Sequence, residues 1–215
     1  FNNKLWMMGG VGSGGVFYND VWYSMDGITW AQIATAGWTA RARHTTVVFD
    51  NKMWVMGGFG GSNYNDVWSS GDGMAWTQEV EEAEWDARAD HRSVLFNNKL
   101  WMMGGVSSGG TVFYNDVWES VNGVTWTRKT EAAGWQARYG HTAVVFNKIW
   151  VMGGADSSEH YYNDVWSFVD EIGATWTQET AADWAARAWH TSVVFNDKMW
   201  VMGGADADGK YGDVW

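Results

Sequence analysis

The sequence predicts an all-β fold, a β-propeller made of four-stranded antiparallel blades, and three observations carry this prediction. A unit of about 48 residues repeats along the chain of 215 residues. Each unit contains four short apolar segments, and turn residues bound each of them. One unit of this size cannot bury both faces of its own sheet, so neighbouring units must stack against one another.

Pairs of adjacent glycines set the register of the repeat. One pair is Gly57 and Gly58, and equivalent pairs recur at 9–10, 104–105, 153–154 and 203–204. On this register the chain is a single propeller region, 1–215, with blades at 1–40 (partial), 41–87, 88–137, 138–186 and 187–215 (partial). It therefore holds about 4.5 blades, which predicts either an incomplete ring or a fragment of a six- or seven-blade propeller.

The turn residues place the strands within each unit. In the second unit the four predicted strands lie near residues 45–49, 52–56, 66–70 and 75–79. Asp50-Asn51 joins the first two strands and suits positive backbone φ angles, and Asp72-Gly73 joins the last two as a strong hairpin signal. Because the chain reverses at every turn, the other two connections must emerge together on the opposite face. These connections are longer and differ between units.

These features resemble the kelch repeat, here of a bacterial, Trp-rich type. The resemblance rests on the paired glycines after the second strand, on Trp68 of the third strand and on Trp76 of the fourth, and it covers nearly the whole chain. The chain departs from the family pattern in having Trp where many members have Tyr on the third strand, and in lacking Pro. The resemblance implies that the first strand of each blade is innermost. It also implies that partners bind on the long-loop face, around the central channel.

Most aromatic and charged residues recur at equivalent positions of every unit. Of the 19 Trp residues all but Trp189 recur, which predicts that they pack the blades against one another. Asp66, Arg88 and His91 also have equivalents in the other units. A polar residue placed identically in every blade is expected to hold backbone segments together by hydrogen bonds.

The candidate binding residues are those that break the repeat on the long-loop face. The residue before the His that opens each first strand differs between units and should ring the mouth of the channel; it is Arg43, Asp90, Gly140 and Trp189 in turn. Tyr139 adds a second flat apolar surface, and His160 lies in a divergent loop. Opposite charges beside aromatic faces suit a sugar or an extended peptide. Ordinary variation at a solvated loop is the alternative interpretation.

Composition excludes several classes of function. The formal charge of −11 argues against a nucleic-acid partner, and no apolar run is long enough for a membrane helix. Without Cys the chain has no thiolate nucleophile and no Cys metal ligand, and it lacks the Cys–Tyr crosslink that copper-radical oxidases on this scaffold require. No isolated carboxylate pair supports glycoside cleavage. We therefore expect no enzyme activity, no cofactor and no metal site.

A further likeness is to sialidase-type propellers. Ser24-Met25-Asp26-Gly27-Ile28-Thr29-Trp30 looks like their Asp-box, one residue short. In that family the box is a turn between the third and fourth strands, so the likeness supports the blade assignment. A sialidase-like or other glycan-active enzyme fragment is thus the least favoured interpretation.

Two functions of different kinds remain. The first is a non-catalytic binding or scaffold module that presents the long-loop face to a protein or glycan partner. The second is a structural role, in which a fragment or an amplified or engineered repeat array self-associates through its incomplete terminal blades. Residues 1–10 and 96–105 are identical, which fits recent duplication. The localisation is left open, with a secreted or bacterial cell-surface protein favoured.

Overall fold

Almost all regular structure in the chain is β-strand. The computed structural model describes residues 1–168 and 175–215. Its only other regular elements in that part of the chain are two short 3₁₀ turns, η1 (Ser13–Gly15) and η2 (Ser108–Gly110). The predicted all-β class is confirmed. Among the described residues, no helix is long and apolar enough to cross a membrane.

Five antiparallel sheets follow one another along the chain, and each is one blade. Blade 1 has three strands, blades 2 to 4 have four each, and blade 5 has two. The bounds are, for blade 1, β1 (Leu5–Val11), β2 (Phe17–Ser24) and β3 (Ala31–Thr35); for blade 2, β4 (Thr45–Phe49), β5 (Lys52–Phe59), β6 (Asn63–Ser70) and β7 (Thr77–Val80); for blade 3, β8 (Arg92–Phe96), β9 (Lys99–Met103), β10 (Val117–Ser120) and β11 (Thr127–Thr130); for blade 4, β12 (Thr142–Val145), β13 (Ile149–Met152), β14 (Val165–Phe168) and β15 (Trp176–Gln178); and for blade 5, β16 (Thr191–Phe195) and β17 (Lys198–Met202).

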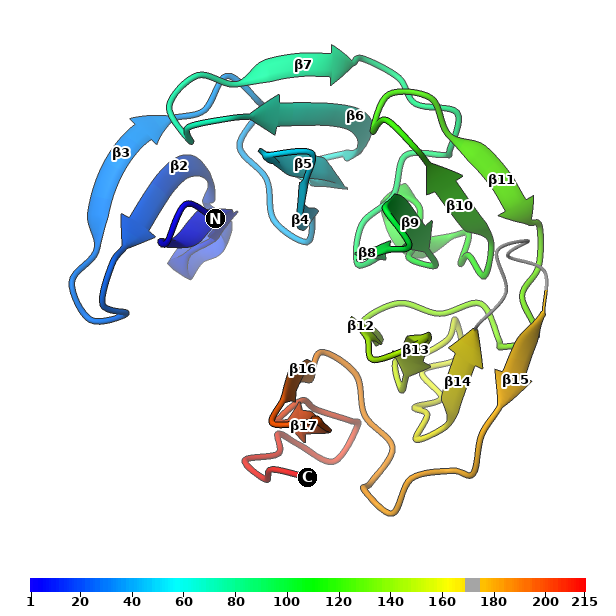
Figure 1. Cartoon of the computed structure of the whole chain (residues 1–215). Helices are drawn as coiled ribbons and strands as arrows, with labels where there is room; N and C mark the ends of the chain where they lie inside the picture. Colours follow the sequence, from blue (N-terminus) through cyan, green and yellow to red (C-terminus); the bar gives the residue numbers. More distant parts are fainter. Residues whose placement is uncertain (169–174) are drawn as a thin grey trace.

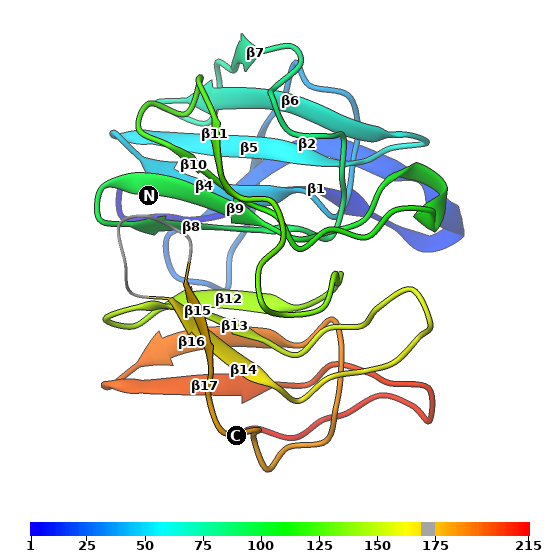
Figure 2. The ribbon, with the colours of Figure 1, turned by 90° about the vertical axis from the view of Figure 1, so that its right-hand side faces the viewer.

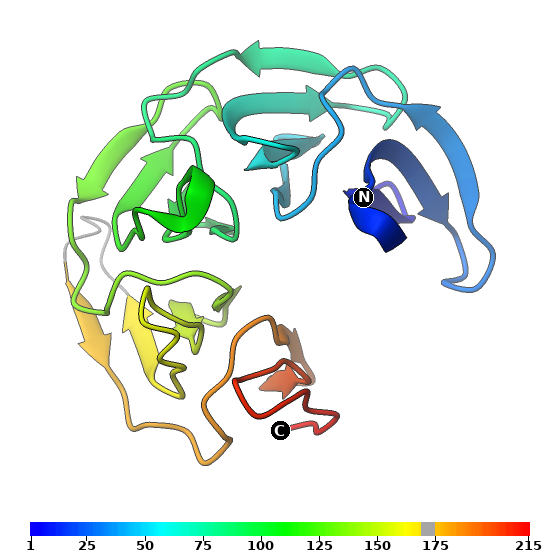
Figure 3. The same ribbon diagram turned by 180° about the vertical axis from the view of Figure 1, so that it is seen from behind.

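The five blades are arranged as an open arc around a common axis (Figure 1). The first strands β4, β8, β12 and β16 face the axis, and β3, β7, β11 and β15 lie on the outer rim. Both ends of the chain border the open sector, as the view from behind also shows (Figure 3). In the side view, the loops between the second and third strands project to the same side of the arc (Figure 2). Loops that are far apart in sequence are thereby gathered on one face.

Among the described residues, blade 5 lacks a full third strand. The segment after β17 pairs with it through an isolated bridge between Met202 and Val214. Two backbone hydrogen bonds between Val201 and Trp215, each 2.9 to 3.0 Å, complete this pairing. The third strand of blade 5 is thus reduced to a short pairing and forms no named strand.

The paired glycines allow the blades to pack closely. The φ angle of Gly57 is +59°, and a Cβ on this residue would lie 2.9 Å from the imidazole Cε1 of His91 in the next blade. A Cβ on Gly58 would lie 2.7 Å from the Cβ of His44, in the innermost strand of its own blade. The first glycine therefore makes room for the neighbouring blade, and the second makes room for the inner strand.

A charged clamp holds each of blades 2 to 5 together. In blade 3, Nη1 and Nη2 of Arg88 donate to both carboxylate oxygens of Asp116 over 2.6 and 2.9 Å, and Nη1 also donates to the carbonyl of Gly104. The indole of Trp118 donates to the same carboxylate, and the Tyr114 ring covers the guanidinium at 3.9 Å. The same pairing occurs between Arg41 and Asp66, Arg138 and Asp164, and Arg187 and Asp213.

Tryptophans join successive blades. Edge-to-face pairs form between Trp38 and Trp76, Trp85 and Trp126, and Trp135 and Trp176, with ring centroids 5.9 to 6.3 Å apart. Each pair links the connection that leaves one blade to the fourth-strand region of the next. In the terminal blades, however, Trp30 is 38% exposed and Trp215 is 50% exposed. A recurring position is therefore buried only where a neighbouring blade covers it.

The segment that resembles an Asp-box, residues 24–30, forms a hydrogen-bonded turn. Within the described residues, blades 2 and 3 form the same turn. In blade 2, Ser70 Oγ accepts a hydrogen bond from Gly73 N, and Asp72 Oδ1 accepts from the amides of Met74 and Ala75 over 2.8 to 2.9 Å. Blade 1 forms the same turn with Ser24 and Asp26. Blade 3 forms it with Ser120 and Asn122. Since these oxygens already bind backbone amides, the motif acts here as a turn.

Candidate functional site

The residue directly before the His that opens each inner strand differs from blade to blade. These four residues lie together at the mouth of the channel. The amide of Asp90 donates to the carbonyl of Arg43 over 3.0 Å, and the amide of Gly140 donates to the carbonyl of Asp90 over 3.4 Å. The amide of Trp189 closes the series on the carbonyl of Gly140 at 2.7 Å. These hydrogen bonds link blades 2 to 5 on the long-loop face. We call Arg43, Asp90, Gly140 and Trp189 the mouth ring.

Every residue of the mouth ring has a left-handed backbone. The φ angles are +58° at Arg43, +54° at Asp90, +64° at Gly140 and +54° at Trp189. Glycine adopts this conformation freely, whereas a bulky side chain there costs about 1–2 kcal/mol. Gly140 is thus the residue that this backbone favours, and Arg43 and Trp189 occupy the same position under strain.

Beside the mouth ring lies a pocket of about 290 Å³ between blades 2 and 3, which we call the mouth pocket. Arg43, Asp90 and Tyr139 line it, so the structure brings together three of the five predicted binding residues. The remaining lining residues are Phe59, Asn63, Ala89, Val106, Ser107, Gly109, Gly110 and Phe113. Asn63 fixes the wall, because its side-chain amide donates to the carbonyl of Val106 over 2.7 Å.

The charged pair in the mouth pocket is unequally exposed. Arg43 Nη1 lies 3.4 Å from Asp90 Oδ2, and the Arg43 side chain is 57% exposed whereas that of Asp90 is 6% exposed. Burial raises the pKa of the Asp90 carboxyl, and the charges of Arg43 and Arg92 oppose this shift. Among the described residues, no donor makes a hydrogen bond to Asp90 Oδ2. Because this oxygen is buried and faces Arg43, the exposed guanidinium is the group of this pair that a ligand can reach.

A row of aromatic rings extends from the mouth pocket across blades 3 to 5. The ring of Phe113 lies 5.4 Å from that of Tyr139, which in turn lies 5.6 Å from Trp189 in an edge-to-face arrangement. Tyr161 follows at 6.5 Å from Trp189. Trp189 is 45% exposed. The row thus offers flat apolar surface next to the polar groups of Arg43 and Asp90.

His160 is the one predicted binding residue that the structure places apart from the mouth ring and the mouth pocket. Its ring packs against Tyr162 of the same loop at 4.8 Å, and its amide donates to Asp156 Oδ1 over 3.1 Å. It is exposed and does not line the mouth pocket. Its place in a divergent loop was not enough to bring it to the site.

Sequence reasoning did not single out Phe59, Phe113 and Tyr161 as binding residues. A usable signal existed, because Phe59 stands where the other units have Val or Ala after the glycine pair. Phe113 and Tyr161 occupy the end of the same loop in their units, where blade 2 has Asn63. The aromatic residues at these loop positions, like the variable residue before each His, are the signal in the sequence that marks them.

The imidazoles beneath the mouth ring add no positive charge at neutral pH. Burial, with the charge of Arg41 as a smaller cause, lowers the pKa of His44 to about 4. Burial, with the charges of Arg92 and Arg187 as smaller causes, lowers that of His190 to about 4. The pKa values of His91 and His141 also lie well below 6.5 for the same main reason. Within the described residues, no group of three His, Asp or Glu side chains could hold a metal ion.

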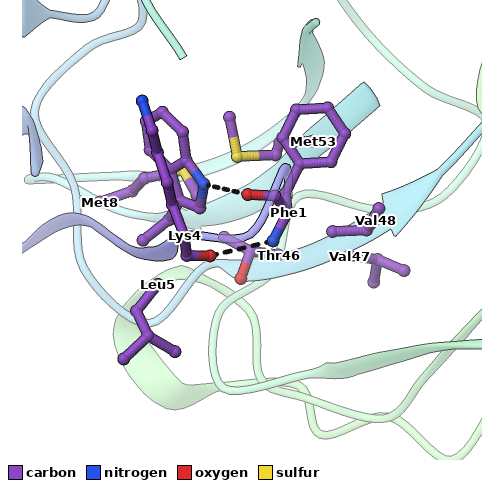
Figure 4. Close-up of a pocket in the computed structure, with 9 residues that line it drawn as sticks. Phe1, Lys4, Leu5, Met8, Thr46, Val47, Val48 and Met53 are labelled. Carbon is purple, nitrogen blue, oxygen red and sulfur yellow. Dashed lines mark hydrogen bonds between the residues drawn. The ribbon is translucent and has the colours of Figure 1, made fainter. Parts of the chain in front are cut away.

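A separate cavity of about 220 Å³ lies between β1 and β4, away from the mouth ring (Figure 4). Leu5, Met8, Val47 and Met53 give it an apolar lining. Blade 1 has no strand on the axial side of β1, and this cavity borders that free edge. Phe1 partly covers it, because its carbonyl accepts a hydrogen bond from the Trp6 indole over 3.0 Å. The cavity is therefore a consequence of the incomplete blade.

Comparisons with known proteins identify the type of repeat. Residues 90–215 match the KLHDC2/KLHL20/DRC7 Kelch-repeats domain, and residues 40–69 match the Kelch motif. Among solved structures, the chain is similar to that titled "Structure of YjhT", with 19% identity and a TM-score of 0.81 over 99% of this chain and 78% of that chain. At this identity the likeness shows the fold alone. No curated protein matches the chain.

Proposed function

The chain belongs to the kelch-repeat family, and from this premise we propose that it is a non-catalytic binding module. Its fold is one that binding and scaffold modules share. Our proposal also assigns the face that binds and the class of partner. The partner is a protein or a glycan, and it binds over the mouth ring and the mouth pocket. Loops held by a rigid scaffold are where binding residues usually gather.

The strained backbone of the mouth ring is the observation that carries this proposal. Arg43 and Trp189 keep large side chains where the equivalent Gly140 would relieve the strain. Strain that persists in a folded protein is a pointer to function, because it costs stability without improving the packing. Trp189 is 45% exposed, so burial does not account for its presence.

The groups at the site define what the partner must offer. The rings of Phe113, Tyr139 and Trp189 suit the apolar face of a sugar or an extended chain. The exposed guanidinium of Arg43, which the buried Asp90 carboxylate pairs with, suits a hydrogen-bond acceptor of the partner. Sugars and extended peptides both carry such acceptors beside apolar surface, so both remain candidates.

The test is a screen of the whole chain against a glycan array and a random-peptide library, followed by titration of any ligand found. Trp189→Gly removes the ring and relaxes the backbone, so the variant folds but should bind at least about tenfold more weakly. Trp30→Ala is the matched control, because it removes an exposed tryptophan at the hairpin end of blade 1. Finding no ligand in either screen, or ligands that tolerate Trp189→Gly, would refute the proposal.

Self-association is the second candidate function, and the exposed apolar surface of blade 5 favours it. Phe195 is 61% exposed and Val193 is 42% exposed, and a shallow apolar cavity is lined by Val193, Phe195, Trp200 and Met202. A second copy of the chain would bury this surface. Light scattering across a range of concentrations should then show dimers that Phe195→Lys abolishes. A concentration-independent monomer would exclude this role.

A further inference from the structure

A second polar pocket is lined by residues at the start of β8, β12 and β16 and by His190, which precedes β16. These are the inner strands of blades 3, 4 and 5, and they face the axis (Figure 1). The pocket has a volume of about 300 Å³, and we call it the axial pocket. It shares no lining residue with the mouth pocket. Its lining residues are Arg92, Thr142, Ala143, His190, Thr191 and Ser192.

Arg92 breaks the repeat inside this pocket. Each His that opens an inner strand is followed by Thr45, Thr142 or Thr191 in the other units, but His91 is followed by Arg92. A threonine is therefore sufficient for the fold at this position, and the blade does not need the guanidinium. As at the mouth ring, a departure from the repeat places a large polar side chain near the axis.

The Arg92 guanidinium has few partners within the protein. Its one hydrogen bond among the described residues runs from Nη1 to the carbonyl of His91 over 2.9 Å. By contrast, Arg88 donates through Nε and both Nη atoms to two carbonyls and a carboxylate. The guanidinium is half-buried, and several of its N–H donors have no hydrogen-bond partner among the described residues. A further acceptor would therefore stabilise it.

The charge of Arg92 is also incompletely balanced. Burial lowers its pKa and the Asp90 carboxylate opposes that shift, but a guanidinium stays protonated at neutral pH. The Asp90 carboxylate forms an ion pair with the Arg43 guanidinium, and the described residues show no ion pair within 4 Å between Asp90 and Arg92. The neighbouring imidazoles of His141 and His190 are neutral, because burial lowers their pKa values. The pocket thus holds one excess positive charge in a chain of net charge −11.

We propose that the axial pocket binds the carboxylate of a small polyhydroxylated molecule. A single guanidinium matches a carboxylate through two parallel N–H···O bonds. Around it, Thr191 is an exposed residue, and the hydroxyl of Thr142 is 2.9 Å from His190 Nε2. These groups provide hydrogen-bond partners for ligand hydroxyls beside the charged contact. The volume exceeds that of a bare carboxylate, so the ligand carries a polar body.

The test uses two probes that differ in the charged group. Gluconate has a carboxylate where sorbitol has a hydroxymethyl group, and the two share the rest of the carbon chain. Calorimetric titration at constant ionic strength should show saturable binding of gluconate and none of sorbitol. Arg92→Thr restores the residue of the other repeats, so it should fold normally and weaken gluconate binding by about tenfold or more. Arg92→Lys keeps the charge but not the paired donors, and its affinity should fall between the two.

Further arms separate this inference from its rivals and from the proposed function. Trp189→Gly should leave gluconate binding unchanged, since the ring is not part of the axial pocket. A short peptide with a free C-terminal carboxylate, compared with its amidated form, tests a polypeptide as the source of the carboxylate. Equal gluconate binding by wild type and Arg92→Thr would overturn the proposal. So would a lack of gluconate binding, or tighter binding of the free-acid peptide than of gluconate.

Discussion

Arg43 and Trp189 show that one backbone position can serve two purposes. The turn before each inner strand needs a left-handed residue, and Gly140 meets this need without strain. The other units use the same turn to present a charge or a ring at the channel mouth. The proposed binding function would account for this stability cost, because the turn holds each side chain at a fixed place.

Arg43→Gly tests this cost directly. The side chain is 57% exposed, so its loss removes little packing, and the left-handed backbone becomes unstrained. The ion pair with the buried Asp90 carboxylate is lost at the same time, which opposes this gain. The free energy of unfolding should therefore change by no more than about 1 kcal/mol, after the extra chain entropy of glycine in the unfolded state. Urea denaturation measures it, with Gly140→Arg as the reciprocal variant that should lose stability. A loss above about 1 kcal/mol in Arg43→Gly would show that the residue is structural.

The arginine clamp predicts a much larger effect at Asp116. Its carboxylate receives two hydrogen bonds from the buried Arg88, so Asp116→Asn leaves a buried guanidinium without its counter-charge. We expect a loss of about 3–5 kcal/mol in unfolding free energy. Asp20 is the matched control, because its carboxylate accepts from the Trp22 indole and no arginine is within ion-pair distance among the described residues. Equal losses in Asp116→Asn and Asp20→Asn would contradict this account.

The strands and their order could be predicted from the sequence because the same pattern of apolar segments and turns recurs in every unit. Five equivalent glycine pairs fix one register, whereas a single apolar run would fit either a strand or a buried helix. The candidate site was only partly predictable. Arg43, Asp90, Tyr139 and Trp189 were found because they break the pattern, but Phe113 meets Tyr139 through packing between loops of different blades. Such contacts depend on blade stacking, which the order of residues does not specify.

The glycine pairs give a prediction about the inner strands. A Cβ at Gly58 would approach the carbonyl oxygen of Ala42 at 2.8 Å, while a Cβ at Gly10 meets nothing within 4 Å because blade 1 has no strand there. Both residues have positive φ angles, so alanine is strained at either one. Gly10→Ala should cost about 1–2 kcal/mol, and Gly58→Ala should cost at least about 1–3 kcal/mol more from overpacking. Thermal unfolding of both variants measures the difference, and equal costs would refute it.

The open arc determines which recurring residues are protected from solvent. Blades 2 to 4 have a neighbour on each side, and in blade 3 Trp118 is 9% exposed and Trp126 is 3% exposed. Their equivalents in the terminal blades are Trp215, which is 50% exposed, and Trp30, which is 38% exposed. Stability in such an array is approximately a sum over blades and their interfaces. The interior blades should therefore resist hydrogen exchange longest.

The four histidines of the inner strands couple the stability of the molecule to pH. His44 and His190 have pKa values of about 4 in the fold, and those of His91 and His141 also lie well below the unfolded value of 6.5. Between pH 6.5 and 4 the unfolded chain therefore binds more protons than the folded one. Stability is fully present above the unfolded pKa and is lost as the pH falls toward the folded values. Each histidine contributes up to about 1.4 kcal/mol per pH unit.

Urea unfolding at a series of pH values across this range measures the coupling. The unfolding free energy should fall steeply below about pH 6.5, and His190→Asn should reduce the slope by up to about 1.4 kcal/mol per pH unit. Asp26→Asn is the control, because hydrogen bonds from Thr29 and Ile28 lower the pKa of Asp26 to about 2, which places its effect at lower pH. A flat profile between pH 6.5 and 4, or one that His190→Asn leaves unchanged, would show that the imidazoles can accept protons within the fold. The imidazoles of His91, His141 and His190 lie against a glycine of the preceding blade. Their protonation would therefore charge the interfaces between blades, and acid should loosen the arc at these interfaces first.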